Sequence, residues 1–526
     1  MSTTTTNPAP FFRLPRRDSP LALRIAVFCV IMGMFMQMLD ATVANVALPY
    51  MQGSLQASRD EITWVLTSYV IAAAIMTGPV GWLATRFGRR EILLISLTGF
   101  TATSALCGLA QTLDQIVIFR LLQGAFGAAL SPLSQAIILD RYTLQERGKI
   151  MAVWSGITMM APIIGPTLGG FLTDNYSWRW VFYVNVPIGI VGITGIYFFL
   201  FEDRMKRPPQ FDWFGFVFLS LALGAMQLLL DRGTDKDWFS STEIVCEAVI
   251  AGLAFYLFFV NQFTVKNPFV DFDLFKDRNF VLGTILTFLV SMLLLSTSAL
   301  LPPYLQNLGG YSVFDTGMML APRGLGTMAS MMVMGRIVMK MDSRLLMVLG
   351  GLILLWSMWQ MSGWTPDISS GTLSGITFLQ GFAMGLVFVP MNLYTYATLP
   401  AAHRTTGSSL LSLVRNLGAA IGVSLTATLL TRSTQANYNQ LAEHASPFNR
   451  ILGLNAPSLM LGPQTPFGAQ NFSHLILQQS TIIAYANVFL FLFFASIPVL
   501  GVILLFRKED LMAGSGAGTS RMEAVE

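Results

Sequence analysis

Long apolar runs separated by short polar stretches occupy most of the 526-residue chain. A membrane-spanning α-helix needs about 17–25 mostly apolar residues to cross a bilayer core of roughly 30 Å. Fourteen runs have that length, so the pattern predicts an all-α integral membrane protein with fourteen transmembrane helices. The predicted spans are residues 22–48, 60–80, 91–110, 114–138, 149–171, 181–201, 212–231, 244–264, 279–302, 314–335, 345–362, 371–397, 407–431 and 482–506.

The composition agrees with this class. Hydrophobic residues make up 53% of the chain and charged residues only 11%, whereas an ordinary soluble domain has roughly 25% charged residues. These proportions exclude a disordered chain and argue strongly against a soluble enzyme. The prediction is therefore a multi-pass membrane protein without enzymatic activity.

Lysine and arginine are distributed unevenly between the predicted loops. With the N-terminus inside, the cytoplasmic segments carry 23 of them and the opposite side carries six. Basic residues in short loops are retained on the cytoplasmic side, so both termini are predicted to be cytoplasmic. A cleaved signal peptide competes as an interpretation of residues 13–48, but the apolar run there is far longer than the roughly 7–15 residues of the apolar core of a signal peptide.

The net charge of +4 comes from short basic clusters rather than from one basic stripe, so no nucleic-acid partner is expected. The few cysteines and histidines lack the spacing of a disulfide framework or a zinc site. No metal and no cofactor are expected. The cysteines are Cys29, Cys107 and Cys246, and the histidines are His403, His444 and His474.

An internal repeat relates the two halves of the chain. The segment Leu122–Gly127 resembles Leu379–Gly385, whose first three residues match at an offset of 257 residues, and the same offset carries Gly165 onto Gly422. A looser echo relates the loop after the second span to the loop after the tenth. Chance similarity between glycine-rich helices is the competing explanation, and three echoes in consistent order disfavour it.

The repeat predicts two six-helix bundles with an extra helix pair inserted between them. Paired halves of this kind often place a substrate site near the membrane midplane and rock around it. The predicted divisions are a cytoplasmic tail at 1–21, an N-terminal bundle at 22–201, an inserted pair at 212–264, a C-terminal bundle at 279–506 with an outer periplasmic segment at 432–481, and a cytoplasmic tail at 507–526.

Asp40 lies inside the first predicted span, within the segment Leu39–Pro49. A charged group at the centre of a membrane helix costs about 2.5–3.5 kcal/mol on insertion scales, and burial favours the neutral form of a carboxyl group. Asp40 is therefore a candidate to hold a proton in one state and release it in another. The alternative is an interfacial or helix-packing aspartate near the outer end of its span.

Arg120, Gln123, Gly124 and Gly127 recur at positions i, i+3, i+4 and i+7 of the fourth span, so they share one helix face. The glycines allow a neighbouring backbone to approach, and a buried arginine needs a carboxylate, a carbonyl or water. Two roles remain open for Arg120. It either tunes a titrating acid electrostatically or ties helices together permanently.

Arg415, followed by Gly418 and Gly422, repeats this theme in the thirteenth span. Arg323 follows a proline in the tenth span and either faces a cavity or lies at a helix break. The polar and charged candidates for lining a substrate cavity are Gln37, Asn45, Gln123, Arg323, Gln380, Asn392 and Arg415.

The fifth span concentrates helix-bending and small residues, namely Pro162, Gly165, Pro166, Gly169 and Gly170. Proline removes a backbone donor and bends a helix, while a glycine face permits tight contact. The segment is therefore either a rigid bent strut or a hinge and seal that limits leakage.

Five segments together resemble the major facilitator superfamily, specifically its fourteen-span drug/proton antiporter (DHA2) family of the EmrB and QacA type. They are Leu39–Pro49, Gly81–Arg90, Arg120–Gly127, Gly165–Gly170 and Trp178–Gly189. The resemblance extends over about residues 22–506.

Two positions depart from the family pattern. Within the loop signature, Gly88, Arg89 and Arg90 match, but Thr85 stands where the family usually has an aspartate that helps to latch the halves together through charge. The latch is therefore expected to be weaker or built differently. Ala161 stands where many antiporters have glycine, a mild change in the same packing role.

The resemblance implies export of amphipathic, structurally varied toxic compounds across a bacterial inner membrane, driven by inward proton movement. It makes Asp40 the proton carrier and Arg120 the residue that adjusts its affinity. Pumps of the EmrB type work with a periplasmic membrane-fusion adaptor (EmrA-like) and an outer-membrane channel (TolC-like). The long outer segment from Thr431 to Thr481 is expected to contact that adaptor.

Two other functions compete with this interpretation. An uptake symporter for a small nutrient is disfavoured by the antiporter signature Gly165–Gly170. A non-transporting scaffold or receptor needs neither Asp40 nor Arg120 inside a span, and no sizeable soluble domain is present to signal. An ATP-driven pump is not expected because the chain lacks a GxxxxGK[ST] loop.

Overall fold

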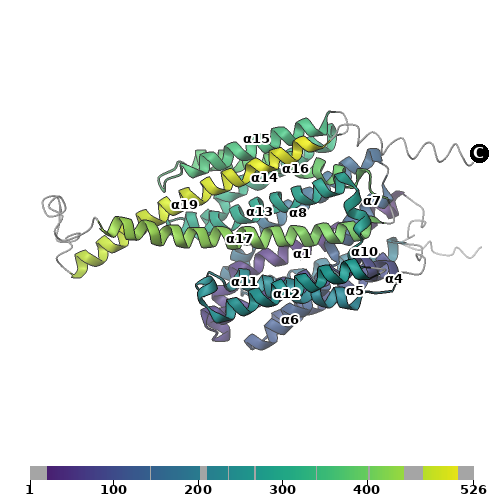
Figure 1. Ribbon diagram of the computed structural model, residues 1–526, viewed down its shortest axis with the longest axis horizontal. Coiled ribbons are helices and arrows are strands. Elements are labelled where there is room, and N and C mark those ends of the chain that lie inside the picture. Colours follow the sequence, from purple (N-terminus) through teal and green to yellow (C-terminus); the bar gives the residue numbers. More distant parts are fainter. Residues whose placement is uncertain are drawn as a thin grey trace, which may run out of the picture.

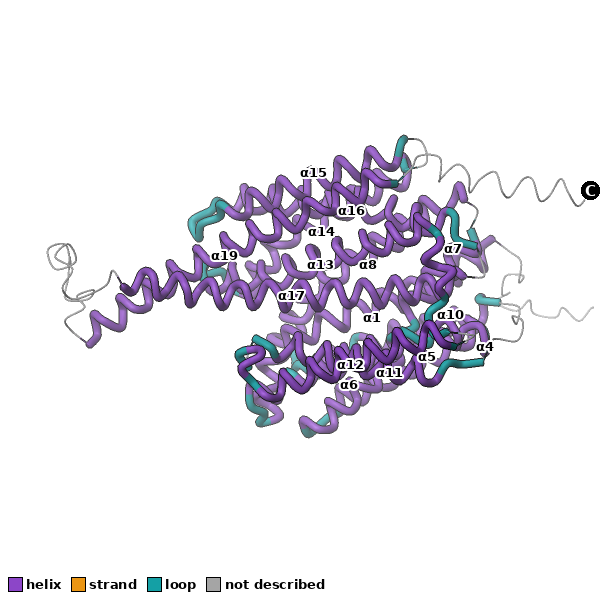
Figure 2. Tube along the Cα trace, in the orientation of Figure 1, coloured by secondary structure: helices purple, strands orange, loops and turns teal. Residues whose placement is uncertain are grey.

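The computed structural model describes residues 20–142, 144–201, 210–234, 236–265, 268–338, 341–400, 403–443 and 466–506. All regular structure in this part of the chain is helical (Figure 2). Apart from residues 20 and 21, the two predicted tails lie outside it. The side chains of Pro162 and Pro166 also lie outside the described residues, so their predicted bending role stays a prediction.

The first part of the described chain contains both short and long helices. Their bounds are α1 Pro20–Leu55, α2 Arg59–Ile62, α3 Trp64–Thr77, α4 Val80–Phe87, α5 Arg89–Leu109, α6 Leu113–Gly127, α7 Leu130–Arg141, α8 Leu144–Asn175, α9 Trp180–Tyr183 and α10 Asn185–Phe199.

The remainder begins with a helix pair and continues with longer helices. The bounds are α11 Trp213–Arg232, η1 Trp238–Ser240, α12 Thr242–Thr264, η2 Phe272–Lys276, α13 Arg278–Asn307, α14 Val313–Ile337, α15 Ser343–Ser362, α16 Ser370–Ala397, α17 Arg404–Glu443 and α19 Pro466–Leu505.

The predicted all-α membrane class is confirmed, whereas the count of fourteen spans is not. Eleven described helices are long and apolar enough to cross a membrane, or twelve if the bent pair α3 and α4 forms one span. The long helices α8 and α14 are not among them, and each carries charged side chains. These two helices pack against each other, which keeps part of their polar surface away from lipid.

Local sequence explains the break between α3 and α4. Pro79 lies at the junction, where its missing N–H interrupts the helical hydrogen bonds, and the two helices meet at 56°. At the far end of α4, Gly88 has a φ of +94°. Side chains rarely tolerate that conformation, so the glycine allows α5 to begin directly at Arg89 in a new direction.

The same helix pairings occur in both halves of the chain (Figure 1). In the first half α1 packs against α8 and α10, and α6 packs against α3 and α5. In the second half α13 packs against α17 and α19, and α16 packs against α14 and α15. The pair α11 and α12 packs together, and α11 contacts α3 and α17. The residue boundaries of the predicted domains stay a prediction.

Two repeated glycines make equivalent contacts in the halves. A Cβ atom on Gly124 would lie 2.3 Å from the carbonyl oxygen of Tyr69, and one on Gly381 would lie 1.9 Å from that of Arg323. Both distances are far below van der Waals contact, so each position requires glycine for the close approach of helices α3 and α6, or α14 and α16. Tyr69 and Arg323 therefore occupy corresponding places in the two halves.

Most other predicted packing glycines also lie against a neighbouring helix. Gly165 and Gly169 of α8 contact Thr42 and Val43 of α1. In the C-terminal half, Gly418 and Gly422 of α17 contact the backbone of α13 at Phe288 and Met292. In the N-terminal half, Gly127 contacts Phe100, and Gly81 contacts Thr406 of α17. Gly170 is buried.

Helices α17 and α19 are each 40 residues long and project beyond the rest of the bundle at one end (Figure 1). The projecting parts hold each other through polar contacts. Asn437 Nδ2 donates to the carbonyl oxygen of Ser480 at 3.3 Å, and the hydroxyls of Tyr438 and Ser473 are 2.9 Å apart. The described part of the predicted outer segment is therefore a helical hairpin, and residues 444–465 lie outside the described chain.

Candidate functional site

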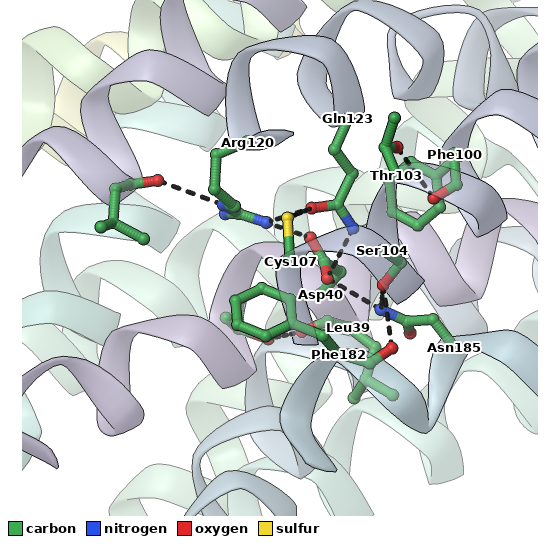
Figure 3. Close-up of polar contacts among 12 residues, drawn as sticks. Leu39, Asp40, Phe100, Thr103, Ser104, Cys107, Arg120, Gln123, Phe182 and Asn185 are labelled. Atoms are coloured by element: carbon green, nitrogen blue, oxygen red, sulfur yellow. Dashed lines mark hydrogen bonds and ion pairs between the residues drawn. The ribbon is translucent and has the colours of Figure 1, made fainter. Parts of the chain in front are cut away.

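Asp40 lies near the middle of α1, because that helix continues to Leu55. It is only 1% exposed and is surrounded by side chains from α5, α6 and α10 (Figure 3). The alternative of an interfacial or helix-packing aspartate stays open, because its place relative to the membrane is not defined by the helix bounds. The carboxylate is buried inside the N-terminal half.

Arg120 forms a direct ion pair with this carboxylate. Its Nη1 atom lies 2.6 Å from Asp40 Oδ2, and neither side chain is exposed. The same guanidinium donates through Nε to the carbonyl oxygen of Val65 at 3.1 Å and through Nη1 to Gln123 Oε1 at 2.9 Å. A charged pair buried this deeply persists only when such hydrogen bonds compensate its lost hydration.

Two amides complete the coordination of Asp40. Gln123 Nε2 donates to Asp40 Oδ1 at 3.1 Å, and Asn185 Nδ2 donates to the same oxygen at 2.8 Å. Asn185 is held in turn by Ser104 Oγ at 3.0 Å. The carboxylate thus accepts hydrogen bonds from α6 and α10 at once, which makes it the point where α1, α6 and α10 are joined.

Aromatic rings contact the guanidinium from two helices. The centre of the Arg120 guanidinium lies 4.1 Å from the ring centroid of Tyr69 and 5.7 Å from that of Phe182. Cation–π contacts of this kind supply attraction that does not depend on a carboxylate. Arg120 therefore keeps favourable surroundings if Asp40 becomes neutral.

Some polar atoms of this network have no hydrogen-bond partner within the described chain. They include Arg120 Nη2 and Asn185 Oδ1, both buried. Unpaired buried donors and acceptors are unfavourable, so these atoms are free to accept or donate a further hydrogen bond. Both predicted roles of Arg120, tuning the acid or tying helices together, remain compatible with this geometry.

A second polar group joins the two halves near the start of α17. Asp140 at the end of α7 accepts from Arg404 Nη1 at 2.7 Å and also binds Arg89. Thr85 does not take part, since its hydroxyl donates to the carbonyl oxygen of Gly81 in its own helix. Asp140, Arg89 and Arg404 thus form an ion triad across the two halves without Thr85, and a latch built differently stays a prediction.

Two predicted cavity residues belong to this junction between the halves. Asn392 Oδ1 accepts from Gln135 Nε2 at 2.7 Å, and Arg415 Nη2 donates to Ser131 Oγ at 2.9 Å. The hydroxyl of Tyr396 donates to Gln135 as well. Arg90, by contrast, binds the carbonyl oxygen of Tyr197 and stays within the first half.

Two other predicted cavity residues, Arg323 and Gln380, lie in the second half, apart from both groups. Arg323 is buried in the second half, where its guanidinium donates to the hydroxyls of Ser298 and Thr297, each at 3.0 Å. Gln380 is buried, and its amide has no hydrogen-bond partner in the described structure. Gln37 is half-buried and Asn45 is exposed.

Sequence reasoning missed Asn185 and Tyr69 as parts of the site. Asn185 lies inside the Trp178–Gly189 signature, where a polar amide in an apolar run was a usable signal. Tyr69 gives no comparable signal in the sequence, because tyrosine is uncharged and is a usual residue near the ends of membrane helices. Among the described residues, no group of His, Cys, Asp or Glu has the geometry to hold a metal ion.

Comparisons with known proteins agree with the arrangement of helices. The family model described as Major Facilitator Superfamily matches residues 30–423. The chain is 34% identical to the multidrug export protein EmrB of Escherichia coli, covering 94% of this chain and 97% of that protein. It is also 34% identical to the fatty acid resistance protein FarB of Neisseria gonorrhoeae, covering 92% and 96%.

A solved structure also shares the fold. The human organic anion transporter MFSD10 superposes with a TM-score of 0.56 and 16% identity, covering 91% of this chain and all of that chain. At this identity the likeness concerns the fold alone.

The ion pair predicts non-additive effects on stability. Arg120→Met leaves a buried carboxylate without its charge partner, a loss worth about 3–5 kcal/mol when a buried pair is broken, and Asp40→Asn leaves the arginine unpaired. We expect each single variant to unfold at a lower temperature in detergent, and the double variant to lose less than the sum of both. Thermal unfolding of the four purified proteins measures this cycle, and strictly additive losses would show that the two residues do not interact.

Proposed function

This chain belongs to the major facilitator superfamily, and on that premise we propose that it exports amphipathic compounds in exchange for protons that bind Asp40. Relatives over nearly its whole length are named for multidrug export and fatty acid resistance. The protein is a multidrug efflux transporter of the EmrB type. Those relatives do not favour an uptake symporter or a non-transporting scaffold.

The observation that carries the proton-coupling proposal is the buried pair of Asp40 and Arg120. A proton and the guanidinium compete for the same carboxylate. When the proton binds, the charge attraction across α1 and α6 is lost, and the cation–π contacts with Tyr69 retain the arginine. A proton drives a conformational change only if the two conformations bind it with different affinity, and exchangeable partners around Asp40 supply such a difference.

The cycle requires that the halves separate at the Asp140 junction. The interactions of Asp140 with Arg404 and of Gln135 with Asn392 hold the two halves together where α17 begins. In our proposal protonation of Asp40 shifts α1 and α6, and this junction then opens to admit a compound from the cytoplasm. Release of the proton to the cytoplasm restores the pair and closes the junction.

The polar groups of the second half are proposed to contact the exported compound. Gln380 has a free buried amide, and Arg323 has only neutral oxygens as hydrogen-bond partners among the described residues. Both are available to polar groups of structurally different compounds. Gln37 and Gln123 remain candidates on the first half.

We further propose that the protein lies in a bacterial inner membrane with both termini in the cytoplasm. The hairpin of α17 and α19 then projects into the periplasm, where it is a surface for a membrane-fusion adaptor that leads to an outer-membrane channel. Exposed positions such as Ala436 and Asn439 lie on this projection.

Proton coupling is tested in inverted membrane vesicles with an imposed pH gradient, acidic inside. The natural protein is expected to accumulate ethidium in the vesicles, whereas Asp40→Asn reduces accumulation to the level of vesicles without the protein, because its amide cannot exchange the proton.

Asp114→Asn is the matched control, since Asp114 is an exposed carboxylate on α6, the helix that carries Arg120. This control is expected to transport normally. Gradient-dependent accumulation by Asp40→Asn at the natural level would remove Asp40 from the coupling mechanism.

Adaptor contact is tested by cysteine crosslinking in intact cells. The exposed Cys246 is first replaced by serine, since Cys29 and Cys107 are buried, and Ala436→Cys is then introduced on the hairpin. We expect a crosslinked adduct with a periplasmic adaptor from this position and none from Asp273→Cys near the opposite end of α17. A complete absence of adducts from Ala436→Cys and from cysteines across residues 440–470 would contradict the adaptor assignment.

A further inference from the structure

A cavity of about 440 Å³ lies outside the Asp40 network, beside the junction of the two halves. The inserted pair forms one wall through Leu219 of α11 and Phe258 of α12. The start of α17 forms another through Thr406 and Leu413, and Gly78 at the break between α3 and α4 closes it. The cavity therefore contacts both halves and the inserted pair at once.

Its lining is strongly aromatic. Phe258, Phe259, Phe269, Phe272 and Phe275 all face this space. Aromatic side chains provide a large apolar surface with preferred edge and stacked contacts, which fits flat aromatic molecules as well as aliphatic ones. The inserted pair contributes no residue to the hydrogen-bond network around Asp40. Lining this cavity is therefore a separate role for its buried side chains.

One polar group gives the cavity a more specific character. Gln262 of α12 is only 3% exposed, and its Oε1 atom has no hydrogen-bond partner in the described structure. Its Nε2 atom donates to the carbonyl oxygen of Val270 at 3.5 Å, which leaves the amide oxygen free in the cavity wall. A buried acceptor without a donor is unfavourable, and a bound molecule that carries an N–H or O–H group removes that cost.

The segment that follows α12 holds the cavity closed on one side. Asp212 Oδ2 accepts from the backbone N–H of Phe269 at 3.2 Å and from Asn261 Nδ2 at 2.7 Å. Asp271 lies 2.8 Å from His403, just before α17. These contacts place the segment against α17, so opening of the junction between the halves changes the shape of the cavity.

We propose that this cavity binds an aromatic compound carrying a hydrogen-bond donor, taken from the cytoplasmic leaflet before it passes between the two halves. This inference rests on the proposed export function. An acyl chain of a membrane lipid fills apolar space equally well, but it carries no donor for Gln262 Oε1.

The test is equilibrium binding to the full-length protein in phospholipid nanodiscs without any pH gradient. The probes are 1-aminoanthracene, which carries an amino donor, and anthracene, which has the same rings without it. Fluorescence titration is expected to show about five- to tenfold weaker binding of 1-aminoanthracene to Gln262→Leu, with anthracene binding unchanged. The variant loses one hydrogen bond, and a tenfold rise in the dissociation constant corresponds to a loss of about 1.4 kcal/mol.

A second variant keeps the proposal open to refutation if Gln262→Leu fails to fold. Ser409→Phe enlarges a side chain on the α17 wall and is expected to weaken the binding of both probes by occupying the space. Unchanged binding of 1-aminoanthracene to either folded variant would overturn the proposal. So would its displacement by added phospholipid, which would identify a lipid as the occupant.

Failure of this inference and failure of proton coupling give different results. Asp40→Asn is expected to bind 1-aminoanthracene with natural affinity, because Asp40 does not line the cavity. Loss of gradient-driven transport in that variant therefore leaves the binding result intact. Conversely, absence of probe binding leaves the vesicle result for Asp40 unaffected.

Discussion

The buried ion pair of Asp40 and Arg120 is the interaction on which the rest of the structure depends. Two opposite charges in a lipid-embedded bundle persist only if they stay together and keep their hydrogen bonds. Gln123 and Asn185 provide those bonds from two other helices. In the proposed mechanism a proton on Asp40 removes the charge attraction between α1 and α6, so one local event alters the packing of the first half.

In the same proposal, close contacts at glycines carry that change to neighbouring helices. Gly124 brings α6 against the carbonyl oxygen of Tyr69 on α3, and Gly165 brings α8 against Thr42, two residues beyond Asp40 on α1. Helices in such contact move together because there is no intervening side chain to yield. The second half repeats the glycine contact at Gly381 but has Arg323 where the first half has Tyr69, so the halves share a scaffold and differ in chemistry.

Sequence patterns predicted much of the fold but only part of the site. Asp40 and Arg120 were identified because charges are rare in apolar spans, but the chain cannot reveal from spacing alone that residues 80 positions apart form a pair. Asn185 was overlooked because it lies in a segment identified for its family signature. The count of fourteen spans is consistent with the fold but not confirmed, because α8 and α14, which pack on each other, are more polar than the helices that are apolar enough to cross a membrane by composition alone.

The most direct measurement follows protons at Asp40 itself. Ethidium is added to the purified protein in weakly buffered detergent solution, and a pH-sensitive dye records proton release. The account predicts release from the natural protein and from Asp114→Asn, and none from Asp40→Asn. Equal release from the natural protein and Asp40→Asn would contradict the claim that this buried carboxyl group exchanges its proton against the exported compound.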